Sequence, residues 1–420
     1  MKKFLVVLLA ILVVVAFAKV KITYFADNDP NGAEALLVKI FNAVHPDIQV
    51  EFIQVPWSTT DKHQMLVTRL GAKDPDPDVY LGDVIWPPEF AAAGWALKLD
   101  DYFPKSEREK YLPGVIDAVT YKGHIYAFPA FTDGGLLFYR KDLLEKYGYD
   151  HPPRTWDELV EMAQTILKGE RAAGNKDLVG FVFQAAQYEG LVCDVLEYVW
   201  ANGGEIIDGN GNIVSDDPKV VEAVKFVHDL IFKYKIAPES VLSFMEEDAR
   251  QVFQQGKAIF MRNWPYAWSH ANSPTSPVKG KVGIAPMPRG PHGSSGAATL
   301  GGWNIFVNAY SDHKKEAIEF AKWLTSKEAQ LIRIIVRNNM PTRKDLYTNK
   351  VALSFNPDLE DFYKIMINAK PRPRTPIYPE VSDIMQRYFH AAVSGKMDPQ
   401  KAIKEMTKEL NELYEEYGLK

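Results

Sequence analysis

Strand-like and helix-like segments alternate along the chain from residue 20 onward, and this alternation constrains the fold more than any other feature. Residues 20–25 and 48–55 alternate apolar and polar side chains as strands do, whereas residues 34–44 and 62–70 have apolar side chains at helical spacing. Residues 78–84 form a third, more continuously apolar strand segment. A repeated strand–helix–strand order indicates an α/β fold with a mainly parallel sheet.

The later part of the chain has the same two kinds of segment. Thr155 and Glu158 have the spacing of a capping box and follow two prolines, which predicts a helix that runs to about residue 168. Further strands are predicted at residues 257–262, 282–285 and 303–307, a hairpin at 203–214 and a helix at 311–326. A chain of 420 residues with two such sets of segments is expected to form two domains.

The first 18 residues have the composition of a secretory signal peptide. Lys2 and Lys3 precede an apolar run that ends in Ala16-Phe17-Ala18, a small-x-small cleavage pattern. The run is shorter than the roughly 20 apolar residues that span a bilayer, although an uncleaved anchor helix is the alternative. We therefore expect a secreted protein that works in the periplasm or at the cell surface.

Charge and motifs exclude several functional classes. The formal net charge is −5 and no long basic run is present, which argues against nucleic acid as a partner. Cys193 is the single cysteine, so no disulfide framework can form. Nucleophile-elbow, zinc-binding and phosphate-loop motifs are absent from the sequence, so no cofactor and no metal are expected.

One segment has the spacing of a calcium-binding loop. Asp208, Asn210 and Asn212 alternate as the first ligands of such a loop do. However, Ile213 stands where the glycine belongs and Lys219 where the bidentate glutamate belongs. We therefore do not expect calcium there.

Polar and aromatic side chains follow the first three predicted strands, at residues 26–31, 56–60 and 83–86. In an open parallel sheet, ligands bind beyond the carboxyl ends of the strands. The chain is also rich in aromatic residues, with nine Trp, 20 Tyr and 22 Phe. A sugar needs an aromatic face for its C–H groups and charged partners for its hydroxyls, which favours a sugar ligand. The alternative is that most of these aromatic residues belong to the core.

Several segments together resemble one known family. They are YAFPAFTDGGLLFYRKDLL at 126–144, PRTWDEL at 153–159, YEGLVCD at 188–194, RNWPYAW at 262–268, GGWN at 301–304 and PRP at 371–373. In this order they are similar to the family 1 extracellular solute-binding proteins of ABC sugar importers, closest to the trehalose/maltose-binding branch. The resemblance extends over essentially the whole chain after the signal peptide.

The resemblance implies a two-lobed periplasmic-binding-protein fold of type II, maltose-binding-like, with a hinge and a ligand cleft between the domains. The N-terminal lobe would contain residues 19–131 and 303–340. The C-terminal lobe would contain residues 132–302 and 341–420.

The resemblance also implies a set of sugar-binding residues. Asp83 and Asp133 would accept hydroxyls, and Arg372 would donate to the sugar, with Arg374 as the alternative donor. The expected stacking residues and close-approach glycines are Trp264, Tyr266, Trp303, Gly301 and Gly302. Without a ligand role, Asp83 could cap a helix, Asp133 could belong to a turn and Trp264 could wedge a loop.

Three positions depart from the branch. The first loop has Asn31, with Glu34 displaced into the helix where the branch often has a sugar-binding glutamate. The second loop has Trp57 in place of a smaller polar residue, and Phe131 replaces a tyrosine. We include Asn31 and Trp57 among the candidate ligand contacts. The departures affect the identity of the sugar, which we expect to be trehalose, maltose, sucrose or glucose.

The sequence therefore predicts a sugar receptor and not an enzyme. Its partners would be a small sugar and the membrane permease of an ABC importer, and it would be a monomer. Two rivals remain: an exported glycoside hydrolase that uses Asp83 and Asp133 as its carboxylate pair, and a receptor of the same fold for an oligopeptide or a polyamine.

Overall fold

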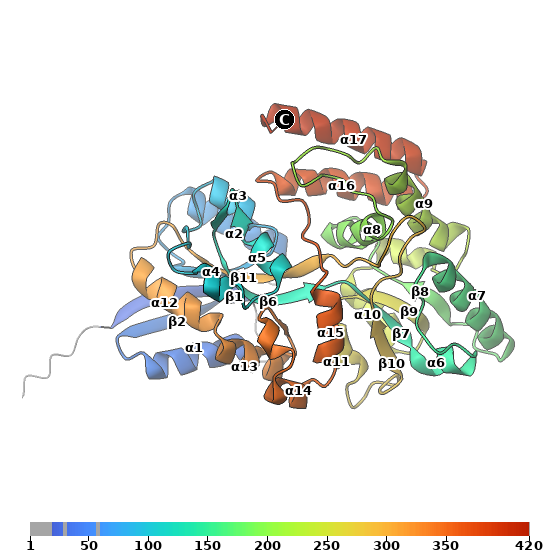
Figure 1. Cartoon of the computed structure of the whole chain (residues 1–420), viewed down its shortest axis with the longest axis horizontal. Coiled ribbons are helices and arrows are strands. Elements are labelled where there is room, and N and C mark those ends of the chain that lie inside the picture. The colour runs from blue at the N-terminus through green and yellow to red at the C-terminus, as the bar shows by residue number, and fades with distance from the viewer. Residues whose placement is uncertain (1–18, 28–31, 56–58, 420) are drawn as a thin grey trace, which may run out of the picture.

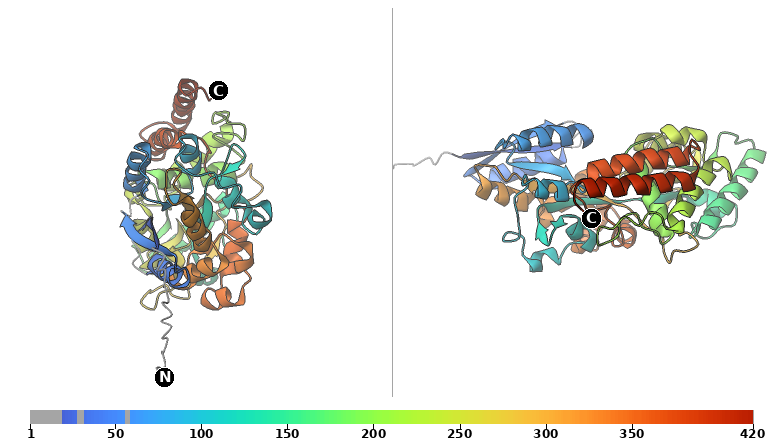
Figure 2. Two further views of the ribbon diagram at one scale, coloured as in Figure 1. Left: turned by 90° about the vertical axis from the view of Figure 1, so that its left-hand side faces the viewer. Right: turned by 90° about the horizontal axis from the view of Figure 1, so that it is seen from above.

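The computed structural model of the protein describes residues 19–27, 32–55 and 59–419. These residues form two α/β lobes, with the C-terminal helices on the second lobe (Figure 1). Seen from above, the lobes lie end to end along the long axis (Figure 2). This architecture confirms the predicted α/β, two-lobed fold. None of the helices in the described ranges is both long and apolar enough to cross a bilayer.

The first lobe is built on a six-stranded sheet of order β12-β6-β11-β3-β1-β2. Its strands are β1 (Val20–Asp27), β2 (Ile48–Val55), β3 (Val79–Asp83), β6 (Phe128–Gly134), β11 (Leu300–Val307) and β12 (Met340–Pro341). Its helices are α1 (Ala33–Val44), α2 (Thr59–Gly71), α3 (Pro87–Ala92), α4 (Lys105–Arg108), α5 (Pro113–Ala118), α12 (Lys314–Leu324), α13 (Lys327–Arg337), η2 (Lys344–Leu346) and α14 (Lys350–Phe355). A small ribbon of β4 (Thr120–Tyr121) and β5 (His124–Ile125) completes it.

The second lobe has a four-stranded sheet of order β10-β7-β9-β8. Its strands are β7 (Leu136–Arg140), β8 (Val179–Val182), β9 (Ala258–Asn263) and β10 (Val282–Ala285). Its helices are α6 (Lys141–Lys146), α7 (Trp156–Ala172), α8 (Glu189–Ala201), α9 (Pro218–Phe232), η1 (Glu239–Ser243), α10 (Glu246–Gln254), α11 (Ala267–Ala271), α16 (Tyr378–Val393) and α17 (Pro399–Glu416). Helix α15 (Leu359–Met366) contacts strands of both sheets.

Strand β3 shows why the first sheet places polar groups at one edge. Val79, Tyr80 and Leu81 are fully buried, and the Tyr80 ring stacks on Phe306 with centroids 5.2 Å apart. A strand that is buried on both faces is apolar along its length. Asp83, the last residue of β3, is the first residue of this strand that is partly exposed.

The hairpin predicted at residues 203–214 is reduced to a single bridge between Ile207 and Ile213. The Asp208 carboxylate lies inside this turn, where Oδ1 accepts the backbone N–H groups of Asn210 at 2.8 Å and Asn212 at 2.9 Å. Asp208 therefore stabilises the turn, as Asx turns do.

The chain passes between the two sheets near Gly135, Thr299 and Lys370. The Gly135 N–H donates to the Thr299 carbonyl at 3.3 Å, and Thr299 bridges Lys370 in parallel. The three crossings are therefore adjacent. The expected lobe boundaries at 131/132 and 302/303 differ from these points, because they fall inside β6 and β11, whose pairing continues as far as Gly134 and Leu300.

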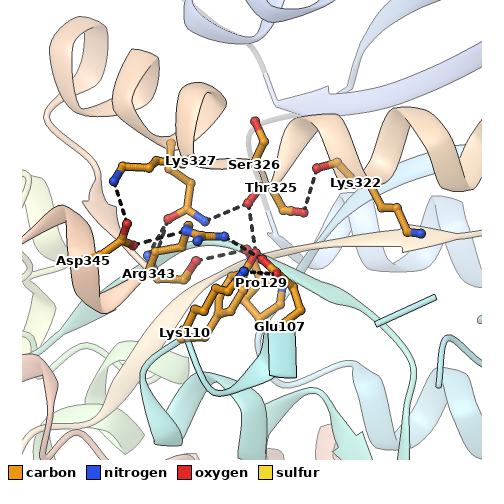
Figure 3. Close-up of polar contacts among 12 residues, drawn as sticks. Glu107, Lys110, Pro129, Lys322, Thr325, Ser326, Lys327, Arg343 and Asp345 are labelled. Atoms are coloured by element: carbon orange, nitrogen blue, oxygen red, sulfur yellow. Dashed lines mark hydrogen bonds and ion pairs between the residues drawn. The ribbon is translucent and has the colours of Figure 1, made fainter. Parts of the chain in front are cut away.

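The segment that follows the third expected boundary, at 340/341, contacts the first lobe. Arg343 donates to Glu107 at 2.8 Å and to Asp345 at 3.3 Å, and the Thr342 hydroxyl donates to the Pro129 carbonyl at 3.1 Å (Figure 3). The contacts with Glu107 and Pro129 attach the segment after β12 to the first lobe, and the contact with Asp345 lies within that segment. We propose that the lobes divide near residues 134/135, 299/300 and 370, because backbone pairing and side-chain contacts change partner there.

Candidate functional site

Four of the predicted site residues lie at one edge of the first sheet. Asp83 ends β3, Asp133 lies at the end of β6, and β11 runs between these two strands. The antiparallel register pairs Trp303 with Asp83 and Gly301 with Asp133. Paired residues of this kind have Cα atoms about 4.5–5.5 Å apart. The two carboxylates therefore flank the start of β11 from opposite sides.

Two glycines make room beside these carboxylates. Gly302 has a φ of +116°, and a Cβ on it would lie 2.5 Å from the Phe131 carbonyl oxygen. A Cβ on Gly301 would lie 3.1 Å from the Trp264 ring and 3.2 Å from the Asp133 Cβ. The absence of a side chain at 301 thus lets Trp264, which follows β9 of the second lobe, reach the first sheet next to Asp133, whereas the glycine at 302 lets β11 approach the backbone of β6.

The Trp264 ring is supported on one face by a buried cation. The Arg262 guanidinium carbon lies 4.1 Å from the ring centroid, and Arg262 is fully buried. Arg262 is held in turn by Asp194 at 2.9 Å and by Glu197 at 2.5 Å. A cation over an indole face contributes about 0.5–2 kcal/mol. This arrangement fixes the position of the ring.

Lys62 is a site residue that does not belong to the predicted set. Its Nζ lies 3.7 Å from the Trp303 ring centroid, and burial lowers its pKa to about 7, although the nearby Asp83 carboxylate acts to raise it. Trp86 packs edge-on against the same ring at 6.2 Å. The pattern of apolar residues indicates only that residue 62 begins a helix. Its position directly after the loop that follows the second strand was the one sequence feature that could have pointed to Lys62.

Arg372 reaches the same edge from the third crossing. Its Nη2 lies 3.5 Å from Asp83 Oδ1, and its Nη1 donates to Glu189 Oε1 of α8 at 2.7 Å. Arg374 lies elsewhere, half-exposed and paired with Asp117 at 2.7 Å. Of the two candidate arginines, the structure brings Arg372 to Asp83. Glu189 is a second residue that the sequence did not single out.

Tyr266 is not brought to this cluster by its described contacts. Its hydroxyl donates to Glu247 of α10 at 2.7 Å, and its ring packs edge-on against His270. Glu247 also pairs with Arg250 at 2.6 Å. These contacts give Tyr266 a role in anchoring the loop after Trp264.

Two predicted contacts and one departure concern the loops of the first lobe. Asn31 and Trp57 lie outside the described residues. Glu34 is buried in α1 and forms a two-point ion pair with Arg333 of α13, at 2.6 and 2.9 Å. The Tyr24 hydroxyl donates to the same carboxylate at 2.9 Å. Glu34 is therefore a structural residue that joins two helices.

Burial changes the acidity of both site carboxylates. It raises the pKa of Asp133 to about 7, with Arg337 opposing and Asp83 adding to the effect. Burial also raises the pKa of Asp83, although the Arg372 guanidinium acts in the opposite direction. Both side chains thus lie in surroundings that favour hydrogen bonds over free charge.

The Asp133 shift predicts a pH dependence of stability. The unfolded chain releases this proton near pH 3.8, whereas the folded protein keeps it to about pH 7. The stabilisation is therefore complete below about pH 4 and is lost as the pH rises to 7. The amide in an Asp133→Asn variant cannot ionise. The difference in melting temperature, wild type minus variant, should therefore decrease as the pH rises from 4 to 7. A constant difference in thermal melts would contradict a raised pKa.

The described residues contain no group of three or more His, Cys, Asp or Glu side chains that could hold a metal ion. Cys193 is buried, and burial raises the pKa of its thiol, which disfavours the thiolate. The cluster instead combines carboxylate acceptors, cationic donors and two indole rings. Such a set suits a neutral ligand with many hydroxyls and one apolar face.

Comparison with known proteins supports this interpretation. Residues 26–331 match the family of bacterial extracellular solute-binding proteins. A probable ABC transporter-binding protein of Deinococcus radiodurans is 39% identical over 388 residues, which cover 91% of this chain and 90% of the relative. The maltotriose-binding protein of Pyrococcus abyssi is 26% identical over 73% of this chain and 62% of its own length.

The solved structure of maltose-bound MalE3 of T. maritima is similar over 94% of this chain and 100% of that one, with 49% identity and a TM-score of 0.84. The family and this structure are binding proteins, in agreement with the expectation that the chain is not an enzyme. By its match over most of its length and its 39% identity to a relative, this chain belongs to the bacterial extracellular solute-binding protein family.

Proposed function

We propose that the protein is the extracytoplasmic sugar receptor of an ABC importer and binds an α-linked glucose disaccharide or glucose between its lobes. The observation that carries the proposal is the approach of Trp264, from the second lobe, to Gly301 and Asp133 of the first. One lobe thereby supplies an aromatic face and the other supplies acceptors for hydroxyls. Maltose is the first candidate, since the 49% identical MalE3 structure holds maltose.

The mechanism would be closure at the three adjacent crossings. A sugar that binds Asp83 and Asp133 of the first lobe can also contact Trp264 of the second lobe only when the two lobes are closed. Such a ligand shifts the equilibrium toward the closed state by its differential affinity for that state. The loaded receptor would then bind the permease, after export and cleavage behind Ala18.

The charges at the site argue against the polyamine alternative. Arg372 lies beside Asp83, so a cationic ligand would meet its positive guanidinium, and Lys62 adds a second positive group below about pH 7. Like charges at short distance disfavour binding. A neutral sugar meets no such repulsion, and its hydroxyls can accept from Arg372 and donate to Asp83.

Isothermal titration of residues 19–420 with maltose, trehalose, sucrose, glucose, spermidine and a tripeptide tests the proposal. We expect one-to-one binding of at least one of the sugars and no binding of spermidine or peptide. A reducing-sugar assay on the trehalose and sucrose samples should show no product. Binding of only the cation or the peptide would overturn the sugar assignment, and product formation would restore the hydrolase alternative.

A further inference from the structure

Glu189 lies in the first turn of α8 and accepts hydrogen bonds from three side chains far away in the sequence. Its Oε1 accepts from Arg372 Nη1 at 2.7 Å and from the Tyr378 hydroxyl at 2.6 Å. Its Oε2 accepts from the Ser382 hydroxyl. Tyr378 and Ser382 both belong to α16, so the carboxylate is held between two helices of the second lobe.

Arg372 is held firmly by this carboxylate and only loosely by Asp83. The Arg372 side chain is 5% exposed. Its Nη1 lies 2.7 Å from Glu189 Oε1, whereas its Nη2 lies 3.5 Å from Asp83 Oδ1. The Nε–H of Arg372 is buried and has no hydrogen-bond partner within the described ranges. Leaving a buried donor without a partner is unfavourable, so a ligand oxygen that reaches this N–H as the lobes move would be favoured.

The face of α8 that carries Glu189 also contacts the chain crossings between the lobes. Glu189, Cys193 and Glu197 are four residues apart and therefore share one face of the helix. The Cys193 carbonyl accepts from the Thr299 hydroxyl at 2.8 Å, and Glu197 Oε1 accepts the Thr299 N–H at 3.0 Å. Thr299 bridges Lys370, two residues before Arg372. The position of Arg372 is thus set by the same helix face that supports two of the crossings.

We infer that Glu189 is a positioning residue for ligand recognition, because it holds Arg372 back from a two-point ion pair with Asp83 and so keeps Arg372 Nε–H and Asp83 available to the sugar. The inference rests on the proposed sugar-binding function. Without the Glu189 charge, Asp83 is the nearest carboxylate to the guanidinium. Arginine and carboxylate groups readily form bidentate pairs, which would occupy the acceptor oxygens that sugar hydroxyls need.

The test compares Glu189→Gln with wild type by titration with maltose. We expect Glu189→Gln to weaken binding roughly 10- to 100-fold, since the charge-assisted hydrogen bond that holds Arg372 is lost. Glu189→Asp, which keeps the charge, should recover part of the affinity. Glu222→Gln is the matched control, since Glu222 lies on α9 of the same lobe and bonds Asn202. It should bind as the wild type does.

A double-mutant cycle shows whether Glu189 acts through Arg372. In an Arg372→Gln background, adding Glu189→Gln should change the affinity by less than about twofold. An equal loss in both backgrounds, or wild-type affinity in Glu189→Gln alone, would overturn the inference.

A readout without ligand separates this inference from the proposed function. The ¹³C carboxyl titration of Asp83, assigned with Asp83→Asn, should move to lower pH in Glu189→Gln. Because the Glu189 charge itself raises the pKa of Asp83, the shift should be larger with Arg372 present than in an Arg372→Gln background, where only that direct effect is lost. Arg372, Glu189 and Lys62 are the charged groups that act on Asp83 in the wild type. An equal shift in both backgrounds, or no shift, would contradict the positioning role whether or not the wild type binds sugar. Absence of sugar binding would by itself reject only the proposed function.

Discussion

Replacing Arg333 with methionine is expected to lower the free energy of unfolding by about 3–5 kcal/mol, because the change leaves the Glu34 carboxylate buried without its counter-charge. Both side chains are 1% exposed, and Arg333 Nη1 also donates to the Leu324 carbonyl at 2.5 Å. Burial alone would raise the pKa of Glu34, but the Arg333 guanidinium, with smaller contributions from the Tyr24 hydroxyl and Arg337, holds this pKa below its usual value. Urea titrations followed by circular dichroism would measure the loss.

Two variants control this prediction. Arg387→Met removes an ion pair with Glu409 whose side chains are 39% and 37% exposed, so its effect should stay within about 1 kcal/mol. A double variant, Arg333→Met with Glu34→Leu, should be less destabilised than Arg333→Met alone, since no charge is left buried. Equal destabilisation in the single and double variants would show that lost packing, and not the stranded charge, is responsible.

Replacing Asp83 with alanine is expected to weaken maltose binding by about 2–4 kcal/mol, roughly 30- to 1000-fold in Kd. The change removes an acceptor for sugar hydroxyls. It also leaves the buried Arg372 without its neighbour on the first lobe, and it removes the carboxylate that acts on Lys62. Isothermal titration at a fixed pH would measure the difference.

The controls for Asp83 separate chemistry from folding. Asp83→Asn keeps the shape and one acceptor oxygen, so it should bind more tightly than Asp83→Ala. Asp117→Ala removes the exposed partner of Arg374 and should leave Kd unchanged. Wild-type affinity in Asp83→Ala, with an unchanged melting temperature, would remove Asp83 from the ligand site.

Several elements were predictable because their determinants are local. The helix expected after Thr155 is α7, where the Thr155 hydroxyl accepts the Glu158 N–H at 3.2 Å and the Glu158 carboxylate accepts the Arg154 N–H at 2.6 Å. The strand at 282–285 is β10 with the same ends. Capping contacts and alternation of apolar side chains act over a few residues, so a single sequence contains them.

Other features could not be predicted because they depend on pairing across the chain. Strand β11 begins at Leu300, three residues earlier than predicted, because its first residues pair with Gly134 and Asp133 of β6. The segment after β12 stays with the first lobe through Arg343 and Glu107, which are 236 residues apart. No local pattern marks contacts of this range.

By itself, the sequence determined the α/β class, the order of most strands and helices, and a set of acidic, aromatic and arginine residues suited to a hydroxyl-rich ligand. Tertiary structure decided which of these meet: Trp264 touches Gly301 beside Asp133, Arg372 rather than Arg374 lies by Asp83, and Glu34 joins Arg333 away from the site. It also added Lys62 and Glu189. The physical reason is that strand register and packing between lobes set side-chain distances, and both are fixed by long-range burial rather than by neighbours in the chain.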